Sequence, residues 1–142
     1  MAELSTARPR TNAGPGRLLI AVYLLFAIAA SSRAALQIVT RFDEAPLAYL
    51  LSALAAIVYV VAAVGLARAG HAGRRIALAC CGLELVGVVG VGAVSLARPD
   101  LFPDETVWSG FGSGYGYIPL VLPVLGLAWL RHTRRRAAAA PS

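Results

Sequence analysis

The sequence predicts an all-α protein, a bundle of four transmembrane helices with short loops and one longer outer loop rich in glycine and aromatic residues. Of its 142 residues, 58% are hydrophobic and 14% are charged, whereas soluble domains carry about 25% charged residues. The mean hydropathy is +0.71. The apolar residues gather in four stretches that are long enough, or nearly so, to cross a bilayer. The arginines gather at the ends of these stretches, as in membrane proteins.

We expect helices over four ranges, about 18–40, 45–67, 75–97 and 113–131. Residues 18–131 then form one membrane domain, flanked by basic cytoplasmic tails at 1–17 and 132–142. The first tail is rich in Pro, Gly, Ser, Thr and Asn, which predicts disorder. Residues 18–30 also have the length of a signal-peptide core, but the helical pattern continues to Val39 and favours an intact first span.

The last span is the least regular of the four. Residues 110–117 alternate glycine with serine or aromatic residues, and only a short apolar run then precedes Arg131. At about 1.5 Å per residue this run covers near 20 Å, less than a hydrocarbon core of roughly 30 Å. We therefore expect the glycine run to enter the outer leaflet, either as a poor helix or as an irregular segment shielded by protein. Pro119 and Pro123 favour a bend in the helix that follows.

The basic residues indicate how the chain is threaded. Every one of them is an arginine, and four spans would place most of them on one side of the membrane. Arg41 and Arg98 fall on the other side with most of the acidic residues, and Arg33 falls within the membrane. Because short arginine-rich loops stay inside, both termini are predicted to be cytoplasmic. The net charge of +6 thus follows from topology, and we do not interpret it as a nucleic-acid signal.

Glu84 is the only residue within 76–97 that can carry a charge. A carboxylate in the middle of an apolar helix needs a partner, a proton or a water-filled cavity. Arg33 in the first span is one possible partner. The alternative is a protonated Glu84 that forms a hydrogen bond with Ser52 or Tyr59, because apolar surroundings favour the neutral form. Small residues on the same face of the helix predict that Glu84 packs against another helix rather than lipid.

Arg33 and Gln37 belong to a polar stripe on the first span, near its outer end. Arg33 either reaches the headgroups and neighbouring acidic residues, or it lines a polar cavity that faces outward. Together with the N-terminus of a helix that begins near residue 118, Arg33 and Gln37 could hold an anion. In the competing structural account, Asp104 or Glu105 folds back onto Arg33.

The outer loop supplies a second candidate region. Trp108, Tyr115 and Tyr117 flank or interleave its glycines. Because Trp and Tyr favour the membrane–water interface, we expect these three side chains to anchor the loop there and to form a candidate outer-loop binding region.

Catalysis has no support in the sequence. Cys80 and Cys81 are adjacent and lie within a span, so we interpret them as packing residues. His71 and His132 lie outside the apolar stretches, which excludes a haem held between transmembrane histidines. No nucleophile–base pair, metal cluster or phosphate loop is present. We therefore expect no catalytic residue, no metal and no cofactor.

Two longer stretches carry a resemblance to known proteins. These are RFDEAPLAYLLSALAA at 41–56 and FPDETVWSGFGSGYGYIPLVLP at 102–123. They resemble small four-helix integral membrane proteins of actinobacteria, whose function is uncharacterised. The resemblance covers the four spans and not the tails. It implies a bacterial plasma membrane and four helices, and it brings no known active residues to this chain.

The sequence thus predicts a multi-pass protein of a bacterial plasma membrane that contacts the lipid bilayer and no nucleic acid. The function we expect is that of a non-catalytic component that packs with copies of itself or with a membrane-protein partner. The alternative is a small transporter or a lipid- or anion-binding protein, with Arg33, Gln37 and Glu84 around an outward-facing polar cavity.

Overall fold

The computed structural model describes residues 14–68 and 70–139 of the chain. Four long helices account for most of them: α1 (Pro15–Arg41), α2 (Pro46–Ala67), α3 (His71–Ala97) and α4 (Ile118–Ala139). Three short 3-10 segments lie in the connections: η2 (Phe42–Glu44), η3 (Pro99–Leu101) and η4 (Ser109–Tyr115). The described part of the chain is therefore all-helical, without strands. The predicted disorder of residues 1–17 falls largely on residues 1–13, which lie outside the described ranges.

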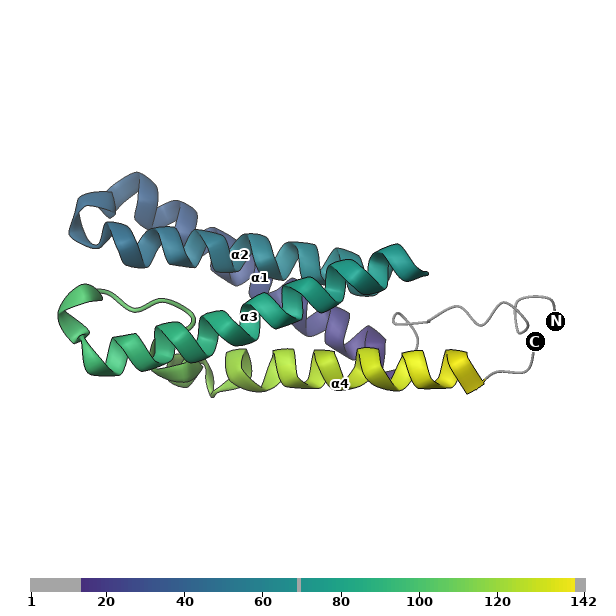
Figure 1. Ribbon diagram of the computed structural model, residues 1–142. Coiled ribbons are helices and arrows are strands. Elements are labelled where there is room, and N and C mark those ends of the chain that lie inside the picture. Colours follow the sequence, from purple (N-terminus) through teal and green to yellow (C-terminus); the bar gives the residue numbers. More distant parts are fainter. Residues whose placement is uncertain (1–13, 69, 140–142) are drawn as a thin grey trace.

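Neighbouring helices in the chain are also neighbours in space. α1 packs along α2, α2 along α3 and α3 along α4, whereas α1 and α4 touch at few positions. Figure 1 shows the α1–α2 and α3–α4 connections at the left of the molecule, and the α2–α3 turn with the end of α4 at the right. Proline occupies a first position of α1 and of α2, where its missing N–H costs no helical hydrogen bond.

The two ends of the molecule differ in charge. The connections at the left end contain the acidic residues Asp43, Glu44, Asp100, Asp104 and Glu105, and we call this the acidic end. The opposite end consists of the first turn of α1, the α2–α3 turn and the last turns of α4. It carries Arg17, Arg68, Arg74, Arg75, Arg131, Arg134, Arg135 and Arg136, and we call it the basic end.

Three helical segments are long and apolar enough to cross a membrane: Pro15–Glu44, Pro46–Ala67 and His71–Ala97, with mean hydropathies of 1.9, 2.5 and 2.1. A fourth candidate consists of η4 and Ile118–Arg136, which are bent relative to each other by 99°. Large apolar side chains cover the outward face of α2, among them Leu54 at 42% and Ile57 at 61% exposure. These features are consistent with an integral membrane protein, because such surfaces suit lipid and not water.

The first three helices lie close to the expected ranges, although α1 begins at Pro15 and α3 at His71, three and four residues before the expected starts. The last helix differs more. α4 begins at Ile118 rather than near 113, and it continues through residues that we expected to form a tail, to Ala139. The preceding glycine run is irregular instead of helical. Gly110, Phe111 and Gly112 all have left-handed backbones, with φ of 57°, 61° and 81°. Glycine adopts this conformation without steric cost, and it makes a sharp turn possible.

The irregular segment is shielded by protein, as one of the two sequence-based alternatives requires. A Cβ atom on Gly92 of α3 would lie 2.5 Å from the ring of Phe111, so the ring packs directly on the helix backbone. Gly112 is buried, and a Cβ atom on it would lie 2.9 Å from ring atoms of Pro119. The α3–α4 connection is therefore packed against both of the helices that it joins.

Candidate functional site

Glu84 lies in the interior of the molecule, with 0% of its surface exposed. Ala77, Cys81 and Val88 lie on the same face of α3, since they follow at helical spacing, and all three are equally buried. The prediction that Glu84 packs against other helices and not lipid is confirmed.

The partner of Glu84 is a tyrosine that the sequence analysis did not select. Tyr23 of α1 is fully buried, and its Oη donates a hydrogen bond of 2.8 Å to Glu84 Oε2. The same Oη lies 3.4 Å from Cys81 Sγ, one helical turn away on α3. Tyr23 therefore links α1 to α3 by polar contacts within the apolar core.

The helices α2 and α4 also reach this point. The ring of Tyr59 in α2 packs at a centroid distance of 6.1 Å from the ring of Tyr23. On α4, a Cβ atom on Gly126 would lie 2.7 Å from Cys81 Sγ and 3.4 Å from Tyr23 Oη. Only a glycine lets α4 approach so closely. We call Tyr23, Tyr59, Cys81, Glu84 and Gly126 the central cluster, because all four long helices meet there.

The polar groups of the core are not all satisfied. Glu84 Oε1 and Ser52 Oγ are buried and have no hydrogen-bond partner among the described residues. Tyr59 Oη accepts a hydrogen bond of 3.2 Å from Trp108 Nε1. The expected bonds from Glu84 to Arg33, Ser52 or Tyr59 are thus not formed. The central cluster thus leaves one carboxyl oxygen of Glu84 without a partner inside a closed core.

Arg33 and Gln37 lie in a second group of polar residues, at the acidic end. Arg33 donates hydrogen bonds to Tyr115 Oη and, at 3.3 Å, to the backbone oxygen of Glu105. Its guanidinium also lies 3.9 Å from the carboxylate of Asp104. Asp104 Oδ2 in turn accepts hydrogen bonds from Gln37 Nε2 at 3.2 Å and from Tyr49 Oη at 3.1 Å.

We call Arg33, Gln37, Tyr49, Asp104 and Tyr115 the acidic-end cluster. It joins α1 and α2 to the α3–α4 connection. Of the alternatives for Arg33, the structural one is therefore observed, since Asp104 folds back onto it. The five residues that we proposed as one intramembrane polar site are divided between this cluster and the core. An outward-facing cavity lined by Arg33, Gln37 and Glu84 is not formed by these contacts.

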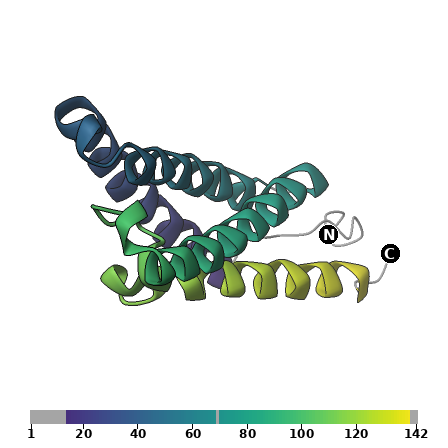
Figure 2. The same cartoon turned by 60° about the vertical axis from the view of Figure 1, so that its left-hand side comes forward.

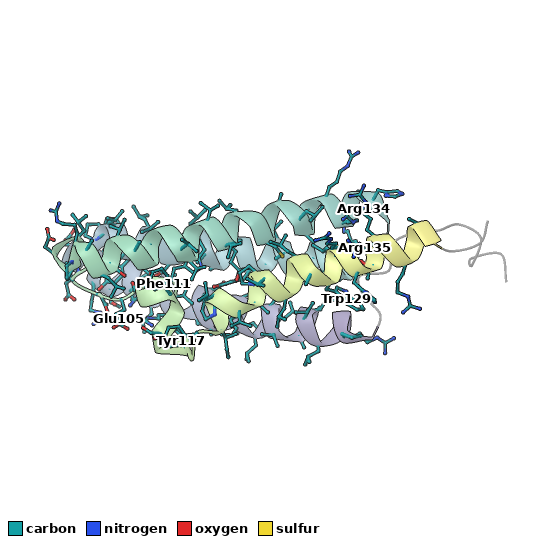
Figure 3. The ribbon with its side chains drawn as sticks, turned by 60° about the horizontal axis from the view of Figure 1, so that its bottom comes forward. Glu105, Phe111, Tyr117, Trp129, Arg134 and Arg135 are labelled. Carbon is teal, nitrogen blue, oxygen red and sulfur yellow. The ribbon has the colours of Figure 1, made fainter. Side chains whose placement is uncertain are left out.

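The three aromatic residues of the outer loop do not share a surface. Trp108 is 2% exposed, and a Cβ atom on Gly87 would lie 2.7 Å from its ring, so the indole packs directly on α3. Tyr115 is half-buried and bound to Arg33. Tyr117 alone is well exposed, at 52%, and Figure 3 shows it beside Phe111 and Glu105. The expectation that all three anchor the loop at the membrane surface is wrong for Trp108, because the glycine opposite opens a place for its ring.

The sequence held signals for the residues that were missed. Tyr23, Ala30 and Gln37 follow at intervals of seven residues, which places Tyr23 on the same face as the polar stripe of α1. Tyr49 gave no comparable signal, because it meets Asp104 only through the fold of the α3–α4 connection. No group of three His, Cys, Asp or Glu residues able to hold a metal occurs within residues 14–68 and 70–139.

Comparisons with known proteins give no relative, since no protein family, curated protein or solved structure matches this chain.

Proposed function

We propose that this chain is an integral protein of a bacterial plasma membrane that acts as a non-catalytic component of a membrane assembly. In this proposal it crosses the bilayer four times as a helical bundle, and its last span is α4 with η4 folded across the outer end. The separation of charge supports the arrangement. The basic end suits the cytoplasmic side under the positive-inside rule, which places both termini there.

The outward face of α3 supports the proposal that the chain belongs to an assembly. Residues at intervals of three or four share one face of a helix. On α3 such a row is exposed or half-exposed and consists of glycine and alanine except for Val86, and we call it the α3 stripe: Ala79, Gly82, Val86, Gly90, Ala93 and Ala97. The outward face of α2 is instead covered by leucine, isoleucine and valine. Small residues mark helix–helix contacts in membranes, whereas bulky apolar residues suit lipid.

Two glycines of the α3 stripe have no role within the single chain. Five other glycines of α2, α3 and α4 each have a neighbouring atom within 3.0 Å of the place where a Cβ would stand, and so are explained by packing: Gly65, Gly73, Gly87, Gly92 and Gly126. At Gly82 and Gly90 nothing lies within 4 Å of that place. Glycine costs a helix about 1 kcal/mol relative to alanine. A second helix packed on the stripe would account for both glycines.

The proposal is tested by enlarging the stripe. Gly90→Leu and Ala93→Leu are expected to shift the chain from oligomer to monomer in mild detergent and in bilayers, because the added side chains hold the second helix away. Sedimentation in detergent and energy transfer between labelled chains in vesicles would measure the change. Ala35→Leu is the matched control, since it adds the same groups to an exposed position of α1.

An unchanged oligomeric state in Gly90→Leu and Ala93→Leu would reject the stripe as the contact. A chain that is already monomeric before substitution would reject self-association altogether and leave a different membrane protein as the partner. The transport alternative needs Arg33 and Gln37 to be available to a cargo. Both are bound to the α3–α4 connection, so no observation favours it over assembly.

A further inference from the structure

The arginines of the basic end lack acidic partners. Among the described residues, the two ion pairs are Arg33–Asp104 and Arg98–Asp100, and both lie toward the acidic end. The basic end has eight arginines in its described part and no carboxylate. In a membrane, the anionic headgroups of lipids can balance such a concentration of guanidinium groups.

The register of α3 against α4 brings two of these arginines to the same level. The helices are antiparallel and approach closely where Cys81 faces Gly126. Arg74 lies seven residues before Cys81, and Arg134 lies eight residues after Gly126. Each is therefore about 11 Å from the close contact along its own helix, in the direction of the basic end. Figure 3 labels Arg134 on the part of α4 toward the basic end.

The side chain of Arg74 is not fully hydrogen-bonded. Its residue is half-buried, and its Nε is buried without a hydrogen-bond partner. Burial is the main cost to its charge, and the charge of Arg134 adds to this cost. Figure 2 shows α3 and α4 diverging toward this end.

The first turn of α3 adds further donors for an anion. Gly70 provides no side-chain cap, and the turn contains no acidic residue. The first amides of a helix have no partner within the helix, and they carry its partial positive charge. A half-buried arginine, a second arginine and an uncapped helix start thus lie toward the same end of α3 and α4.

We propose that Arg74 and Arg134 bind the phosphate of an anionic phospholipid headgroup between the start of α3 and the end of α4. Arginine suits this ligand, since its planar donors match phosphate oxygens in pairs. The lipid chains would continue along the apolar surface of the helices. The inference rests on the proposed placement in a bilayer, and it is independent of self-association through the α3 stripe.

The experiment measures binding of defined lipids to the full chain in detergent at 0.15 M salt, by native mass spectrometry and by the thermal unfolding midpoint. Dioleoyl phosphatidylglycerol is expected to bind and to raise the midpoint, and the zwitterionic phosphatidylcholine is expected to do so much less. Arg74→Gln and Arg134→Gln should each weaken phosphatidylglycerol binding about tenfold, as expected for the loss of a hydrogen bond between charged groups.

Arg135→Gln is the matched control. It removes the same charge from the next residue of α4, on the opposite side from the buried Leu130 and Thr133. At this salt concentration charges are screened over about 8 Å, so its effect should be small. If Arg135→Gln weakens binding as much as Arg74→Gln, the basic end is a diffuse charged surface and the site is rejected. If inorganic phosphate at millimolar concentration raises the midpoint equally, the ligand is a soluble phosphate and the lipid assignment is rejected.

Two further measurements distinguish the loss of a binding site from damage to the structure. The double variant Arg74→Gln/Arg134→Gln should lose little more than either single variant, because both arginines serve one phosphate. In detergent without lipid, Arg74→Gln should unfold at the same or a higher temperature, because it removes repulsion from Arg134. The proposal would be contradicted if the losses of the two single variants multiplied in the double variant, or if Arg74→Gln lowered the unfolding midpoint. Recovery of each variant from the membrane fraction would show that a loss of lipid binding is not caused by a failure to insert into the membrane.

Discussion

Tyr23 and Glu84 form a polar contact that each of them needs. Both side chains are fully buried, and a buried carboxyl without a hydrogen bond is costly. Tyr23 Oη supplies the one hydrogen bond that Glu84 receives, at 2.8 Å, while Oε1 is left without a partner. Removal of the tyrosine hydroxyl would therefore leave the whole carboxyl unsatisfied in the core.

We expect Tyr23→Phe to lower the free energy of unfolding by roughly 1–3 kcal/mol, the usual consequence of orphaning a buried polar group. Thermal or denaturant unfolding in a fixed detergent would measure it. Tyr117→Phe removes the same hydroxyl at a position that is 52% exposed, and should change stability by less than about 0.5 kcal/mol. Equal effects of the two substitutions would show that the Tyr23–Glu84 hydrogen bond contributes nothing.

The α3–α4 connection is the element that ties the acidic end together. Its aromatic rings lie on glycines of α3, with Trp108 on Gly87 and Phe111 on Gly92. Its carboxylate, Asp104, binds polar side chains of α1 and α2. The connection thus closes the acidic end through apolar contacts on one side and hydrogen bonds on the other.

Replacement of Asp104 should open this end. In Asp104→Ala, the buried Gln37 and Tyr49 lose their acceptor, and we expect a loss of roughly 2–3 kcal/mol in the free energy of unfolding. Asp104→Asn keeps an acceptor oxygen and should lose less. Hydrogen exchange of the connection, measured by mass spectrometry, should rise in Asp104→Ala and remain low at the central cluster.

Asp100→Ala provides the comparison for Asp104→Ala. Asp100 lies in the same connection, and hydrogen bonds from Arg98 hold the pKa of its carboxyl below the usual value. Because both partners are more than half exposed, the pair is expected to add little to stability. If Asp100→Ala destabilises the protein as much as Asp104→Ala, the acidic-end cluster has no special role.

The elements that were predictable from sequence are those set by local composition. The first three helices follow from apolar stretches bounded by Pro46, Gly70 and Arg98. Contacts between distant segments were not predictable in the same way. The packing of Trp108 on Gly87 depends on a turn that contains three left-handed residues. No periodicity in the sequence indicates such a turn. For Glu84 the sequence suggested Arg33, Ser52 or Tyr59 as the partner, whereas the fold supplies Tyr23.

At the scale of the whole molecule, charge and packing change together along the helix axes. The four helices converge at the central cluster, where glycine and cysteine allow close approach. Toward the basic end α3 and α4 diverge around arginines (Figures 1 and 2), and toward the acidic end a packed connection closes the structure. Two polar ends and an apolar middle match the profile of a bilayer, and the asymmetry of charge predicts an orientation.

This orientation is tested with single cysteines in intact cells. Ser113→Cys lies on the exposed part of the acidic end, and His71→Cys lies in the exposed first turn of α3 at the basic end. An impermeant thiol reagent should label the first in whole cells and the second only after the membrane is opened, since the basic end is expected to face the cytoplasm. The unaltered chain should remain unlabelled, because Cys80 and Cys81 lie along α3 between the two ends, where a charged reagent does not enter. Labelling of His71→Cys but not Ser113→Cys in whole cells would reverse the orientation and place the proposed phosphate site on the outer leaflet.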